Sequence, residues 1–60
     1  MSHEIVKVWD MPYEISVHQQ SKSVWIASGT YMGSQLQVKR PTRGAAMKGW
    51  IDAARYAGNG

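Results

Sequence analysis

The most informative stretch of this 60-residue sequence is residues 24–40, VWIASGTYMGSQLQVKR. Residues 24–31 are rich in β-branched and aromatic side chains, and residues 35–39 alternate between polar and apolar, as strands with one buried face do. Between them, Met32-Gly33 has the length of a two-residue hairpin loop, and Gly33 tolerates the positive φ that such a loop needs. The stretch therefore predicts an antiparallel hairpin.

The loop also sets the register of this hairpin. If Met32 and Gly33 form the loop, directly opposed residues share a face of the sheet. The predicted core face then carries Trp25, Ala27, Gly29, Leu36 and Val38. The opposite face carries Val24, Ile26, Ser28, Thr30, Gln35, Gln37 and Lys39. It is polar apart from a small apolar spot at Val24 and Ile26, which is typical of a sheet with one face in water.

The flanking segments predict a third strand before the hairpin and a helix after it. Upstream, Tyr13, Ile15 and Val17 alternate with polar residues, and residues 19–22 form a polar break. Downstream, Pro41 ends the last strand and Thr42 is well placed to cap a helix that Gly58 ends. The apolar stripe of this helix consists of Ala46, Met47, Trp50, Ala53, Ala54 and Ala57, and its solvated stripe of Lys48, Asp52 and Arg55.

Residues 1–12 leave three alternatives open. Ile5, Val6, Val8 and Trp9 have strand character, but Pro12 cannot donate a hydrogen bond to a sheet. The segment is therefore an additional edge strand, a bent extension of the strand that follows it, or an N-terminal arm that packs on its own domain or pairs with a second chain. The expected fold is a single α+β domain over residues 1–60, with three or four antiparallel strands and one C-terminal helix packed on one face.

Composition excludes several classes of protein. The chain has no cysteine, its two histidines are not at metal-ligand spacing, and its four carboxylates are dispersed. No serine lies in a nucleophile-elbow pattern and no glycines form a phosphate-binding loop. We therefore expect no enzyme, no metal site and no cofactor. With no apolar run near the ~20 residues of a membrane span and no signal-peptide pattern, we expect a cytoplasmic domain without a membrane partner.

The formal charge of +3 is unevenly distributed. Residues 1–38 hold two lysines against three carboxylates, whereas residues 39–60 hold five basic residues against Asp52 alone. Such an asymmetry favours a polyanionic partner, although a net charge of this size also serves solubility. The same charge excludes a protein that mimics DNA.

Residues 13–57 resemble the DNA-binding domains built from a three-stranded sheet and a helix. These include the plant ethylene-response-factor type and the arm-binding domain of tyrosine recombinases. The resemblance lies in the run TRGAA at residues 42–46, which is followed by Trp50 and by Ala53-Ala54. The matching positions are Thr42, Ala46, Trp50 and Ala54 on the helix, with Tyr13, Trp25 and Ala27 on the strands. The family lays its open sheet face in the major groove, and this chain departs from it in having no arginine at a strand centre.

Two hypotheses of function follow. In the first, the chain is a nucleic-acid-binding module in which Gln35, Gln37 and Lys39 contact bases while Lys22, Arg40 and Arg43 contact phosphates. In the second, it is an interaction protein, either a homodimer or an accessory or inhibitor protein of the phage or mobile-element type. The second hypothesis uses Trp9 of the N-terminal segment and the apolar spot at Val24 and Ile26.

Overall fold

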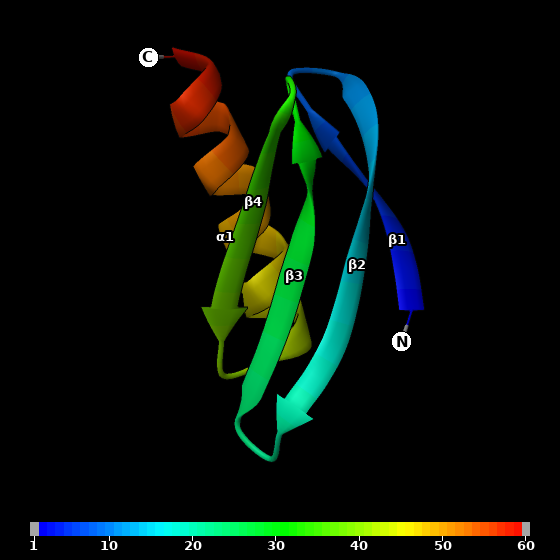
Figure 1. The fold of residues 1–60 in the computed structure, drawn as a ribbon, viewed down its shortest axis with the longest axis vertical. Helices are drawn as coiled ribbons and strands as arrows, with labels where there is room; N and C mark the ends of the chain where they lie inside the picture. Colours follow the sequence, from blue (N-terminus) through cyan, green and yellow to red (C-terminus); the bar gives the residue numbers. More distant parts are fainter. Residues whose placement is uncertain (1, 60) are drawn as a thin grey trace.

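A four-stranded antiparallel sheet with one helix across it makes up the molecule (Figure 1). The computed structural model describes residues 2–59, and the side chains of residues 3–57. The strands are β1 (Ser2–Val8), β2 (Met11–Ser21), β3 (Val24–Tyr31) and β4 (Ser34–Arg40), and the helix is α1 (Arg43–Asn59). Consecutive strands are neighbours in the order β1-β2-β3-β4, so each connection is a hairpin. The predicted α+β class and the order of its elements are confirmed.

The β3–β4 hairpin has the predicted register. Tyr31 pairs with Ser34, Gly29 with Leu36 and Ala27 with Val38, and Trp25 pairs with Arg40. Met32 and Gly33 have φ values of 52° and 83°, which is the positive-φ pair of a type I′ turn. The core face and the open face of this hairpin are therefore those that the alternation predicts.

Residues 2–8 form the edge strand β1, which pairs with β2 from Ser2–Val17 to Val8–Met11. The two-residue loop between them is Trp9-Asp10, and both residues have positive φ. Pro12 lies inside β2, although it cannot donate a hydrogen bond to a sheet. It fits because the register between β2 and β3 begins only at Ser16, so Pro12 lies outside the part of β2 with registered neighbours on both sides.

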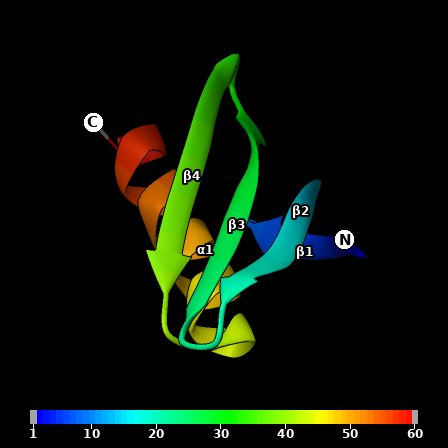
Figure 2. The same cartoon turned by 60° about the horizontal axis from the view of Figure 1, so that its bottom comes forward.

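β2 is longer than its sequence predicts. The polar residues 19–21, expected to form a break, continue the strand, and only Lys22 and Ser23 make the turn into β3. The register between β2 and β3 shifts at a bulge between Gln19 and Ser21. The polar residues there remain part of the strand, and the residues before the bulge keep their alternation between the two faces of the sheet. β2 thus pairs with β1 through its first part and with β3 through its last, as its bend shows in Figures 1 and 2.

The core lies between the sheet and α1, and Trp50 is at its centre. This indole is fully buried and its Nε1 donates to the carbonyl oxygen of Leu36 at 3.2 Å. The rings of Tyr13 and Tyr31 each lie 6.4 Å from that of Trp50, centroid to centroid. The other buried members are Val6, Val8, Ile15, Val17, Ala27, Val38, Ala46 and Ala54.

The helix begins where predicted. The Thr42 Oγ1 accepts from the amide of Ala45 at 3.1 Å, and the Thr42 carbonyl accepts from the amide of Ala46 at 2.9 Å, so Thr42 is the N-cap. At Gly49 a Cβ would lie 2.8 Å from Val38 Cγ1, so the absence of a side chain lets α1 approach β4 closely. The helix continues to Asn59, past the end predicted at Gly58, and Ala57 is exposed rather than part of the apolar stripe.

Candidate nucleic-acid interface

The side of the sheet that faces away from α1, the open face, carries the row of polar side chains that the sequence predicts on β4. Gln35, Gln37 and Lys39 are all exposed, and they pair across the hairpin with Thr30, Ser28 and Ile26 respectively. Alternate residues of a strand project from the same face, about 6.6 Å apart. Two amides and one ammonium group therefore form a line along the outermost strand.

Acidic charge on the open face lies on the other half of the sheet. Glu14 on β2 pairs with Ile5 of β1, and its Oε2 lies 3.8 Å from Nδ1 of His3. The strand order places β3 between Glu14 and β4. The half of the open face formed by β3 and β4 contains only neutral polar side chains, Val24, Ile26 and Lys39, so Glu14 does not place a negative charge beside them.

The β2–β3 turn, the end of β4 and the start of α1 lie at one end of the molecule (Figure 2), and each of these segments contains a basic residue. Lys22 lies in the β2–β3 turn, and an open groove beside it is lined by residues of that turn and of the β4 end. The lining of this end groove consists of Ser23, Val24, Lys39, Arg40 and Pro41. Residues from separate hairpins thus share one surface.

Arg40 and Arg43 lie differently from the other predicted contacts. Arg40 is opposite Trp25, on the side of the sheet that faces α1, and its guanidinium runs beside Gly49 while its Nη1 donates to the Lys39 carbonyl at 2.7 Å. Arg43 forms an ion pair with Glu4 of β1, with Nη2 donating to Oε2. The end groove therefore brings Lys39 and Arg40 together, with Lys22 in the adjoining turn, and the charge of Arg43 is compensated by Glu4.

We expected Val24 and Ile26 to form an exposed apolar spot, and this prediction is wrong. Ile26 lies on the open face as predicted, but only 5% of it is exposed, and Val24 is half-buried. The cross-strand neighbours of Ile26 are His18 and Lys39, and their side chains flank it on both sides. A sequence pattern gives the face of a residue but not the cover supplied by its neighbours.

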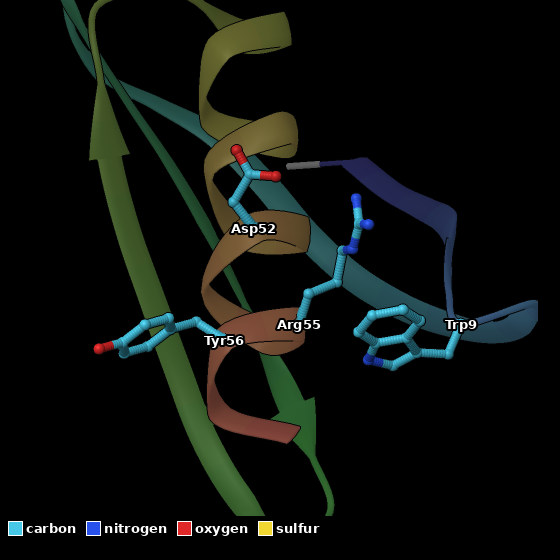
Figure 3. Close-up of a pocket in the computed structure, with 4 residues that line it drawn as sticks. All are labelled: Trp9, Asp52, Arg55 and Tyr56. Atoms are coloured by element: carbon cyan, nitrogen blue, oxygen red, sulfur yellow. The ribbon is translucent and has the colours of Figure 1, made fainter. Parts of the chain in front are cut away.

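Trp9, the third residue of the expected partner site, is 53% exposed at the tip of the β1–β2 hairpin. Its backbone has a φ of 52°, which is unusual for a bulky residue. The Arg55 guanidinium of α1 lies 5.0 Å from the centre of its ring, a cation–π contact that Figure 3 shows in a pocket together with Asp52 and Tyr56. Trp9 therefore closes the hairpin tip onto the helix.

Sequence reasoning missed the partners of Trp9 and the contribution of Ser23. One signal could have indicated the first hairpin, because two residues separate Val8 from Met11 and alternating segments flank them. Among residues 2–59, no group of three or more metal-binding side chains forms a candidate metal site. No helix in the described part of the chain has the length and apolar character needed to cross a membrane. No protein family model, curated protein or solved structure matches this chain.

Proposed function

We propose that this chain is a small, non-enzymatic nucleic-acid-binding domain that uses the β3–β4 half of its open face. The observation that supports this proposal is the line of Gln35, Gln37 and Lys39, which is exposed along one strand and continuous with the cations of the end groove. A glutamine amide can donate to and accept from the edge of adenine, and a lysine can donate to guanine or to phosphate. A hairpin is also narrow enough to enter a major groove about 12 Å wide.

The charge distribution supports the same surface. Of the four carboxylates, Asp10 lies in the β1–β2 loop, Glu14 lies two strands from β4 and Asp52 lies on the solvated side of α1. The fourth, Glu4, is paired with Arg43. A polyanion that approaches the β3–β4 half of the open face therefore meets cations without a neighbouring unpaired carboxylate.

An amide chemical-shift titration with a short mixed-sequence DNA duplex tests this proposal. We expect shifts at Thr30, Gln35, Gln37 and Lys39 that weaken as the salt concentration rises. Gln37→Glu adds a negative charge to the line without changing side-chain size, and it should weaken binding about tenfold or more. The matched control is Lys48→Gln, which changes the net charge by the same amount on the solvated side of α1.

Two outcomes of this titration would contradict the proposal. One is an absence of shifts even at low salt, and the other is a set of shifts centred on Trp9 and Arg55 at the opposite end. Equal weakening by Gln37→Glu and Lys48→Gln would show that only net charge matters. In that case the open face would have no particular role.

A second candidate function is binding to a protein, including a second copy of this chain. The observation that favours it is the gathering of large exposed apolar side chains at the end opposite the cations. Met32 and Tyr56 are 76% and 84% exposed, and Trp9 and Met11 are more than half exposed. Sedimentation velocity of Tyr56→Ser against Ile5→Ser, an exposed apolar residue on the open face, tests this candidate. Only loss of self-association confined to Tyr56→Ser would support it.

A further inference from the structure

We propose that the end groove binds one backbone phosphate of the nucleic acid, held by Lys39, Arg40 and the Ser23 hydroxyl, with Lys22 beside it. This inference rests on the proposed function and adds a defined anchor to it. It also shifts the expected phosphate contact away from Arg43 and toward the turn between β2 and β3.

The position of the groove follows from the topology. The hairpin that joins β2 to β3 returns the chain at Lys22 and Ser23, next to the place where Pro41 ends β4. Ser23 is exposed, so its hydroxyl can donate into the groove, and the half-buried Val24 lines the same groove. Residues that carry a hydroxyl, an ammonium and a guanidinium group thus line one open groove.

Arg40 is held in place within this arrangement. Its Nη1 donates to the carbonyl of Lys39, and the side chain lies along Gly49, where α1 approaches β4 closely. A guanidinium has five N–H donors, so this one bond leaves others for a ligand. Neither Lys39 nor Arg40 forms an ion pair within the described residues, so their charges are uncompensated.

Charge complementarity and continuity with β4 favour a phosphodiester as the occupant. Two adjacent cations and a hydroxyl suit an anion with several acceptor oxygens. Lys39 and Gln35 are four residues apart on one strand, which is roughly 13 Å. A backbone anchored at the groove can therefore present successive bases to Gln37 and Gln35. A single carboxylate bound in the groove would make no contact with Gln35 or Gln37.

The salt dependence of binding to a DNA duplex tests the groove. Each phosphate contact that is lost should reduce the slope of log K against log salt by about 1 in magnitude. We expect this reduction for Lys39→Gln and for Arg40→Gln, with similar weakening on two duplexes of unrelated sequence. Lys48→Gln, with the same loss of charge away from the groove, should leave the slope within about 0.3 of the original.

Ser23→Asp provides a variant that does not depend on the packing of Arg40. It places a negative charge in an exposed turn, and we expect it to weaken binding by at least tenfold while thermal unfolding stays unchanged. If Lys39→Gln, Arg40→Gln and Lys48→Gln all have the same slope while the unmodified protein binds DNA, the groove assignment is wrong and the proposed function stands. If the unmodified protein does not bind DNA, both proposals are wrong.

Discussion

Gly29 is the residue of β3 at which the sheet and the helix leave no space for a side chain. A Cβ there would lie 2.8 Å from Ile15 Cγ2 and 3.1 Å from Trp50 Cζ2. We expect Gly29→Ala to lower the free energy of unfolding by about 1–3 kcal/mol, because an added methyl overpacks the core. Urea denaturation followed by circular dichroism measures this change.

Gly44 provides the matched control for Gly29. It lies in the first turn of α1, and a Cβ there would meet no atom within 4 Å. Gly44→Ala should therefore raise the free energy of unfolding by about 0.5–1 kcal/mol, the usual gain from replacing glycine in a helix. Changes of the same sign in both variants would contradict the close contact at Gly29.

At the scale of the secondary-structure elements, the start of α1 depends on Thr42. Its hydroxyl satisfies the amide of Ala45 at a helix start that has no acidic residue in its first turn. Thr42→Ala should cost about 1 kcal/mol, and Thr42→Ser should cost little because serine keeps the hydroxyl. Thermal unfolding of the two variants measures the difference, and equal losses would mean that the hydroxyl does not act as the cap.

The β3–β4 hairpin has a loop that can be improved. Met32 has positive φ and is 76% exposed, so its side chain contributes little while its backbone is strained. Met32→Asn creates the Asn-Gly pair that type I′ turns favour, and we expect it to raise stability by about 0.5–1 kcal/mol. The control is Met11→Asn, an exposed methionine in a strand, which should be neutral or destabilising.

The two hairpins differ in how well the sequence predicts them. Met32-Gly33 contains a glycine at a position of positive φ, and clean alternation follows it, so the register of β3 and β4 is predictable. Trp9-Asp10 contains no glycine, and Pro12 follows it closely, so its turn chemistry indicates the β1–β2 hairpin less strongly than Met32-Gly33 indicates the other. In the structure a long-range contact is made at that loop, where the Arg55 guanidinium lies over the Trp9 ring.

At the scale of the whole molecule, the candidate site likewise has one part that the sequence predicts and one part that it does not. The line of Gln35, Gln37 and Lys39 follows from the alternation of one strand, so the sequence predicts it. The end groove does not follow, because it joins the β2–β3 turn to the end of β4. The pairing of Glu4 with Arg43, which neutralises a predicted phosphate contact, joins residues 39 positions apart and leaves no local pattern.

The position of each strand in the sheet predicts how readily that strand opens. β3 is registered with strands on both sides, whereas β1 has β2 alone as its neighbouring strand. We expect amide hydrogen exchange in β1 to be at least tenfold faster than in β3, because edge strands open locally at lower free-energy cost. Equal exchange rates in β1 and β3 would show that the sheet opens only as one unit.

The three tryptophans lie in different environments, and this has an optical consequence. Trp9 is half exposed at one end, Trp25 lies opposite Arg40 near the cations, and Trp50 is enclosed in the core. An indole in water emits at longer wavelength than one in an apolar environment, so the three contribute separable components. We expect a ligand at the end groove to change the emission of Trp25, a partner at the hairpin tips to shield Trp9 from a quencher, and only unfolding to shift the emission of Trp50. The chain thus carries its own reporters for the two surfaces and for the core.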